Sequence, residues 1–93
     1  MATYTFQITL PQVVDSLTVE LPYFCNEGSS FYAMLDEKTI ISVNDWQTIG
    51  QANVWLYNEV PLSMKSPNCK PITRSEFMEK YNTVIAKFIE KLW

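Results

Sequence analysis

The chain has no histidine, and it has only two glycines among its 93 residues. Histidine is the commonest general base near neutral pH and the usual partner of a nucleophilic serine or cysteine. Its absence excludes the Ser-His and Cys-His arrangements that most hydrolases use. With Gly28 and Gly50 alone, the chain also lacks the glycine-rich loop that binds phosphate groups. We therefore expect a protein that is not an enzyme, with no catalytic residue and no cofactor.

Cysteines and long apolar runs are also scarce. Cys25 and Cys69 are the only cysteines, and neither a CxxC pair nor a histidine is present to complete a metal site. We expect no metal and two free thiols, as in a reducing compartment, although a disulfide between them stays open. The chain has no apolar run near the ~18 residues of a membrane span, and its start lacks the pattern of a signal peptide. These features predict a cytoplasmic protein that does not associate with a membrane.

Basic residues are rare in the first two thirds of the chain. Residues 1–62 carry seven acidic residues and one lysine, whereas residues 63–93 carry three acidic and six basic residues. Nucleic-acid-binding domains are normally basic, so nucleic acid is not the expected partner. The split charge favours self-association, or an acidic partner at one end of the molecule.

Alternation of apolar and polar residues predicts strands over most of residues 1–60. Tyr23–Ser30 is typical of a loop because of Gly28-Ser29-Ser30, and Asn44–Gln51 is either a short helical turn capped by Asp45 or an irregular connection. The last predicted strand is apolar on both faces, which indicates an interior or covered strand. The predicted strands are Thr3–Leu10, Leu17–Leu21, Phe31–Leu35, Thr39–Val43 and Ala52–Val60.

The last third of the chain predicts a loop and then one long amphipathic helix. Pro61–Pro71 contains three prolines and is expected to be an extended tether. In Ile72–Trp93, Thr73 and Glu76 fit a capping box, and Ile72 with Phe77 fits a hydrophobic staple. The apolar residues of this helix recur at steps of three and four, and they are Phe77, Tyr81, Val84, Ile85, Phe88, Ile89 and Leu92.

Together these patterns predict one α+β domain over residues 1–93, with a mainly antiparallel sheet of about five strands packed against the C-terminal helix. Residues 1–60 are mainly β, residues 61–71 form the proline-containing loop, and residues 72–93 form the helix. We expect the aromatic strand at residues 52–60 to be the surface on which the helix packs.

Two groups of residues are candidates for binding a ligand or partner. Trp46, Trp55 and Tyr57 either lie in the core beneath the helix or form a surface that stacks on a base, a sugar or a protein. Trp93 follows the last polar turn and is expected to be exposed. Lys70 and Arg74 flank the free amides of the helix N-terminus and are a candidate anion site, although Glu76 already occupies part of that position.

Two stretches carry a resemblance to known proteins. The hairpin Phe31–Val43 and the helix start Ile72–Phe77, followed by Tyr81, resemble small uncharacterised proteins of gut Bacteroidetes and their phages. These proteins have no activity that could be transferred to this chain. The resemblance implies a phage or mobile-element protein, which would act in the cytoplasm of the host cell.

We therefore expect a non-enzymatic protein-interaction or self-assembly protein, phage-encoded if the resemblance holds, with a protein or a second copy as partner. The alternative is a small-molecule binder that holds a nucleotide or another anion between subunits through Lys70, Arg74 and a tryptophan. A third hypothesis is an enzyme that uses carboxylates alone. Asp36-Glu37 is the one adjacent acidic pair, and its place at an exposed turn does not favour that chemistry.

Overall fold

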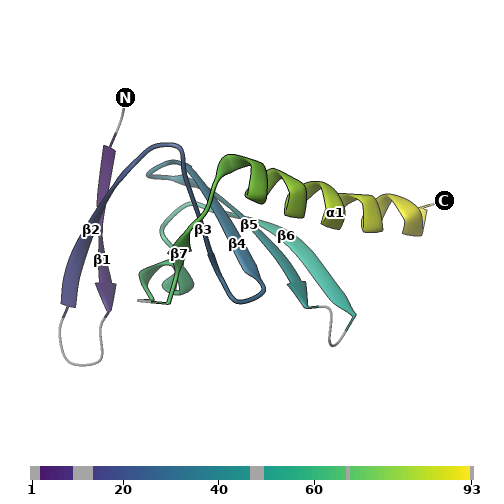
Figure 1. Ribbon diagram of the computed structural model, residues 1–93, viewed down its shortest axis with the longest axis horizontal. Coiled ribbons are helices and arrows are strands. Elements are labelled where there is room, and N and C mark those ends of the chain that lie inside the picture. Colours follow the sequence, from purple (N-terminus) through teal and green to yellow (C-terminus); the bar gives the residue numbers. More distant parts are fainter. Residues whose placement is uncertain (1–2, 10–13, 47–49, 67, 93) are drawn as a thin grey trace.

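A computed structural model describes residues 3–9, 14–46, 50–66 and 68–92 of the chain (Figure 1). The first two strands form a two-stranded antiparallel sheet, and the others form a five-stranded antiparallel sheet in the order β6-β5-β4-β3-β7. One long helix follows, so the α+β fold expected from the sequence is confirmed. The elements are β1 (Thr3–Thr9), β2 (Val14–Glu20), β3 (Tyr23–Glu27), β4 (Ser30–Asp36), β5 (Thr39–Trp46), β6 (Gln51–Tyr57), the 3₁₀ helix η2 (Leu62–Lys65), β7 (Lys70–Pro71) and α1 (Arg74–Leu92).

The five-stranded sheet has an apolar core on each of its faces. On one face, Ala33 and Val43 pack against Phe77 and Val84 of α1. The other face packs against the β1–β2 hairpin and η2. The buried residues of this second core, from the sheet, the hairpin and η2 together, are Phe6, Val19, Cys25, Tyr32, Met34, Ile40 and Met64. The sheet is therefore the middle of three layers, which explains why its strands are apolar on both faces.

The predicted loop at Tyr23–Ser30 is wrong, because this segment contains β3 and the first residue of β4. Gly28 has a φ of 56° and lies in the short turn between these two strands. The flexible composition of that turn concealed the strand before it. Cys25 is fully buried between β4 and β7, so β3 is an interior strand.

The segment around Asp45 also differs from its prediction. Asp45 and Trp46 are the last residues of β5, so Asp45 does not cap a helical turn, and residues 47–49 lie outside the described residues. The loop predicted at Pro61–Pro71 contains η2 and the short strand β7, which pairs with β3. These elements depend on contacts with distant parts of the chain, which local sequence patterns do not carry.

The start of α1 follows the sequence prediction closely. The Thr73 Oγ1 accepts a hydrogen bond of 3.1 Å from the Glu76 amide, which confirms Thr73 as the N-cap. The return contact differs from a standard capping box, because the Glu76 carboxylate accepts from the Thr73 hydroxyl at 3.2 Å. Ile72 packs against the cluster that contains Phe77, as the hydrophobic staple predicts.

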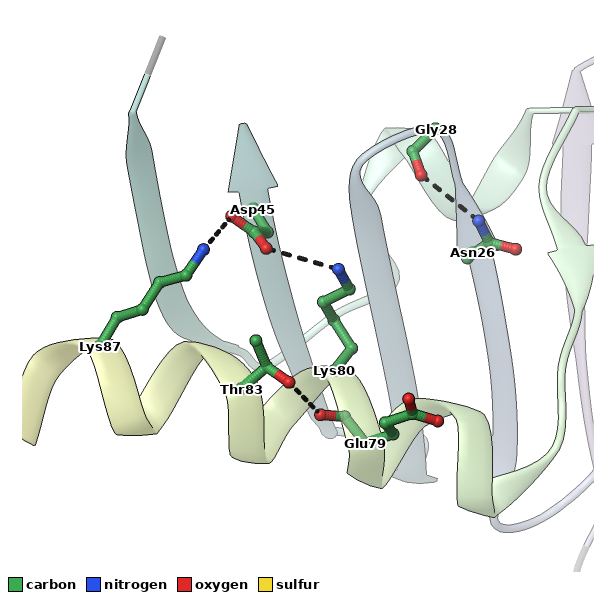
Figure 2. Close-up of polar contacts among 7 residues, drawn as sticks. All are labelled: Asn26, Gly28, Asp45, Glu79, Lys80, Thr83 and Lys87. Atoms are coloured by element: carbon green, nitrogen blue, oxygen red, sulfur yellow. Dashed lines mark hydrogen bonds and ion pairs between the residues drawn. The ribbon is translucent and has the colours of Figure 1, made fainter. Parts of the chain in front are cut away.

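Replacing Thr73 with alanine is expected to lower the free energy of unfolding by about 1 kcal/mol, because the Glu76 amide loses its acceptor. Thr83→Ala is the matched control. The Thr83 hydroxyl donates to the Glu79 carbonyl within the helix at 2.9 Å (Figure 2), and alanine has the higher helix propensity there. Urea denaturation measures both changes. Equal losses in the two variants would contradict the capping role of Thr73.

Candidate functional site

The helix α1 is longer than the part of the sheet that it crosses. It begins beside β3, where the Ile72 amide donates to the Phe24 carbonyl at 2.9 Å, and then contacts β4, β5 and β6. Strands lie about 4.8 Å apart, so the distance from β3 to β6 is about 14 Å, or about ten helical residues. Because α1 has 19 residues, its last turns extend beyond β6 (Figure 1).

The exposure of the apolar residues follows this geometry. Phe77 is 3% exposed and Val84 is fully buried, whereas Phe88 is 37% and Leu92 is 83% exposed. The apolar stripe predicted along the whole helix is therefore covered only over its first half. We call the exposed part, formed by Phe88, Ile89 and Leu92, the helix overhang.

The expectation that Trp55 and Tyr57 form the surface beneath the helix is wrong. Trp55 pairs with Ser42 and Tyr57 with Ile40, and these residues lie on the sheet face opposite α1. Tyr57 packs there against the core of the hairpin side, while Trp55 is 61% exposed. Alternation in a strand that is apolar on both sides does not show which face meets which neighbour.

The residues of β6 that do face α1 are Ala52, Val54 and Leu56, since they pair with Asp45, Val43 and Ile41. Ala52 and Val54 pack in the core with Phe77 and Val84. Leu56, at the far end of the strand, is 66% exposed. The helix therefore covers the beginning of β6 and leaves its end uncovered.

The strand β6 is also a free edge of the sheet. It pairs with β5 and with no other strand in the described part of the chain. Its sequence, QANVWLY, contains neither a charged residue nor a proline. Natural edge strands normally carry such residues, or bulges, to prevent pairing with another chain. A seven-residue edge without them is suited to accept a further strand.

An ion-pair cluster holds the helix in place at this edge. Asp45 on β5 is almost fully buried, and its carboxylate contacts Lys80 at 3.4 Å and Lys87 at 3.0 Å (Figure 2). The ammonium group of Lys80 also lies 5.4 Å from the centre of the Phe31 ring. Because Lys87 directly precedes the overhang, these contacts fix the direction in which the overhang leaves the sheet.

A cavity of about 420 Å³ lies where the overhang passes the beginning of β6. Trp46 lines it together with Lys87 and Phe88 of α1. The other residues that line it are Gly50, Gln51, Ala52, Asn53, Glu90 and Lys91. Of the aromatic residues predicted to bind a partner, Trp46 is thus the one beside the overhang, and Trp55 is on the opposite face of the same edge.

The predicted anion site does not include these tryptophans within one copy of the chain. Lys70 and Arg74 are exposed on β7 and at the start of α1, at the sheet edge opposite β6. The Glu76 carboxylate sits at the same helix start and is bonded to Thr73. Trp93, the remaining predicted residue, lies outside the described residues. Leu56, Phe88 and Ile89 are exposed, although their apolar character favours burial and the sequence pattern does not predict them at the surface.

A second cavity, of about 570 Å³, lies between the β1–β2 hairpin and β3, β7 and η2. It is lined mainly by apolar residues, and Tyr23 and Cys69 are among them. The other lining residues are Ile8, Leu17, Thr18, Val19, Glu20, Pro22, Phe24, Met64, Ser66, Pro71 and Ile72. This volume is in the range of small-molecule pockets.

Tyr23 at this cavity is expected to ionise late. Desolvation by burial, followed by repulsion from the nearby Cys25 and Cys69, raises the pKa of Tyr23 to about 12 from its ordinary 10.0. The folded state therefore keeps a proton that the unfolded state loses, so the stability of the protein should fall as the pH rises from 10 to 12. Absorbance titration of the phenols and urea denaturation across this range measure both effects. Because burial also raises the pKa of Tyr32, Tyr23→Phe should remove one of the late-titrating phenols and reduce the pH dependence, and an unchanged titration curve would contradict the assignment.

The described residues contain no group of three or more Cys, Asp or Glu side chains arranged to hold a metal ion. Across the same part of the chain, no helix has the length and apolar character needed to cross a membrane. Comparison of the chain with protein families, with curated proteins and with solved structures finds no match.

Proposed function

We propose that this protein is a non-enzymatic self-assembly protein, which pairs with a second copy of itself through the edge strand β6. The observation that carries the proposal is the combination of an uncharged free edge with a helix that extends past it. Two such edges can pair antiparallel about a two-fold axis, because the same surface then serves both partners. The pairing joins the two five-stranded sheets into one.

The position of α1 over β6 indicates how the copies fit. If the axis passes through Val54, antiparallel register places Leu56 of one copy opposite Ala52 of the other, on the helix side of the sheet. Each overhang leaves its own sheet over the beginning of β6, near Gln51–Asn53. The overhang of the second copy then lies above Leu56 and covers the end of β6 that the first copy leaves exposed.

Charge supports the same arrangement. The overhang is bordered by Lys87, which already pairs with Asp45, and by Glu90 and Lys91, whereas β6 is followed by the exposed Glu59. Antiparallel pairing brings Lys91 of one copy toward Glu59 at the end of the other copy's strand. Such complementarity orients partners and speeds their encounter.

Sedimentation equilibrium tests the proposal on the unmodified protein. The expected mass is twice the monomer mass of 10.8 kDa at micromolar concentration, with dissociation on dilution. Hydrogen exchange provides a local readout, because amides at the free edge of β6 should gain protection as the concentration rises. A monomeric mass at all concentrations, with exchange along β6 independent of concentration, would contradict it.

A second candidate function is small-molecule binding, which the cavity of about 570 Å³ favours. Thermal-shift measurements with nucleotides and with small apolar compounds separate the two possible ligand classes. The mainly apolar lining favours the second class, and a Tm that none of the compounds shifts would count against this function. The phage origin implied by the resemblance and the cytoplasmic location stay predictions.

A further inference from the structure

The two cysteines, 44 positions apart in the sequence, are neighbours in the fold. Cys25 on β3 is fully buried, and Cys69, which directly precedes β7, packs against the same core. The pairing of β3 with β7 places Cys25 opposite Pro71, near the segment that contains Cys69. Both are free thiols, and they lie close enough for each to influence the ionisation of the other.

The two thiols differ in access. Cys69 is half-buried and lines the cavity of about 570 Å³ between the hairpin and β3, whereas Cys25 has no exposed surface and does not line that cavity. A small molecule that enters the cavity therefore reaches Cys69 and not Cys25. This order, with one accessible thiol and one buried thiol in contact with it, is the arrangement of a reactive cysteine with a resolving cysteine.

We propose that Cys69 and Cys25 form a thiol pair that hydrogen peroxide oxidises to a disulfide within one chain, with Cys69 reacting first. This inference does not depend on the proposed self-assembly, since both residues lie away from β6.

The chemistry balances with hydrogen peroxide as the oxidant. The Cys69 sulfur attacks one peroxide oxygen, the S–O bond forms as the O–O bond breaks, and the leaving hydroxide takes up the thiol proton as water. The Cys25 sulfur then attacks the Cys69 sulfenic acid, so the S–S bond forms as the S–O bond breaks. A second water leaves with the Cys25 proton. Reduction requires an added thiol such as dithiothreitol, which is itself oxidised to its disulfide.

The electrostatics around the pair support this order of events. Donation from the Cys25 thiol lowers the pKa of Cys69, although burial opposes the shift. The same hydrogen bond, together with burial, raises the pKa of Cys25. The directions of the two pKa shifts agree with the order that access sets, in which Cys69 reacts first. Once Cys69 becomes a neutral sulfenic acid, its negative charge no longer raises the pKa of Cys25. The Cys25 thiol then ionises more readily than before.

The disulfide would act on the shortest strand of the five-stranded sheet. The strand β7 has two residues and pairs with β3 through two register positions, and it leads directly into α1. A covalent bond at this point constrains the unfolded chain and keeps β7 on the sheet. The oxidised protein is therefore expected to have a Tm several degrees above that of the reduced protein.

The test is peroxide treatment of the full chain, followed by intact-mass measurement, thiol alkylation and peptide mapping. The expected product has lost the two thiol hydrogens and has no alkylatable thiol. It yields one cross-linked peptide that contains Cys25 and Cys69. Dithiothreitol returns the protein to its starting mass. Cys25→Ala should stop at a sulfenic acid on Cys69 that dimedone traps, and Cys69→Ser should leave Cys25 unmodified.

Circular dichroism shows whether each variant is folded. If Cys25→Ala does not fold, the peptide map of the unmodified protein still shows whether Cys25 and Cys69 form a disulfide within one chain. Free glutathione treated in parallel sets the peroxide exposure. The proposal is overturned if both thiols stay alkylatable when glutathione is fully oxidised. Disulfides that form only between chains would also overturn it.

Discussion

Replacing Leu56 with lysine is expected to convert the protein from a dimer to a monomer. Leu56 is 66% exposed in one copy, so the substitution should change the stability of the monomer by no more than about 0.5 kcal/mol. In the proposed dimer it removes an apolar side chain covered by the other copy's overhang and introduces an ammonium group near Lys87 and Lys91. A leucine contributes about 1.5–3 kcal/mol when fully buried, and symmetry applies the loss twice, so Kd should rise by at least ~100-fold.

Leu62→Lys is the matched control for this experiment. Leu62 is 82% exposed and lies on η2, which contacts β1 and β3 on the hairpin side of the sheet, whereas Leu56 lies on the helix face of β6. The control variant should sediment as a dimer, like the unmodified protein, at every concentration tested. Loss of the dimer in both variants would indicate a general effect of added charge, and a dimer that persists in Leu56→Lys would place the interface elsewhere.

Replacing Phe77 with alanine is expected to lower the free energy of unfolding by about 3–5 kcal/mol. The Phe77 side chain is 3% exposed, its ring centre lies 5.6 Å from that of Phe24 and 6.2 Å from that of Tyr81, and it packs against Val43 and Val84. Removing the ring leaves a cavity between helix and sheet in a small domain whose total stability is about 5–15 kcal/mol. Urea denaturation followed by circular dichroism measures the loss.

Phe88→Ala, on the same apolar stripe of the same helix, is the control for this second prediction. Phe88 is 37% exposed because it lies on the overhang, so its removal should cost less than about 1.5 kcal/mol in the monomer. Both substitutions are best measured in the Leu56→Lys background, where association does not add to the stability. Equal losses at the two positions would mean that the helix packs along its whole length, contrary to the exposed overhang.

The two pairs of variants examine different consequences of one geometric fact. The helix is longer than the distance from β3 to β6, and therefore the first half of its apolar stripe is buried against the sheet while the second half is exposed in one copy. Phe77 and Phe88 lie on the same apolar stripe of the helix. Replacing each with alanine should nevertheless lower the free energy of unfolding by different amounts. Their difference measures how far the sheet extends beneath the helix.

Much of the fold follows from local patterns in the sequence. Period-two alternation predicts β1, the hairpin of β4 and β5, and β6, since side chains of a strand point to alternate faces. The helix is predicted by its 3.6-residue period and by the Thr73 cap, which is a contact over three residues. These features depend on neighbours in the chain, so a single sequence contains them.

The contacts between distant residues were decided by the tertiary structure. Local patterns do not predict β3, because its burial comes from β4 and β7 and the turn glycine beside it favours a loop. The sequence leaves Asp45 as either a helix cap or part of an irregular connection, whereas Lys80 and Lys87, which approach it from α1, give it a different role. The meeting of Cys25 with Cys69 likewise depends on the pairing of β3 with β7.

The sequence by itself determined that the chain has a sheet, a long C-terminal amphipathic helix and no histidine-based chemistry, because composition and periodicity are properties of the chain. The tertiary structure alone decided which face of β6 meets the helix and how far along the helix that contact continues. Trp55 and Leu56 are adjacent in the sequence and lie on opposite faces of the edge. Strand order and helix direction set which apolar residues are covered, since these fix where one element ends relative to another.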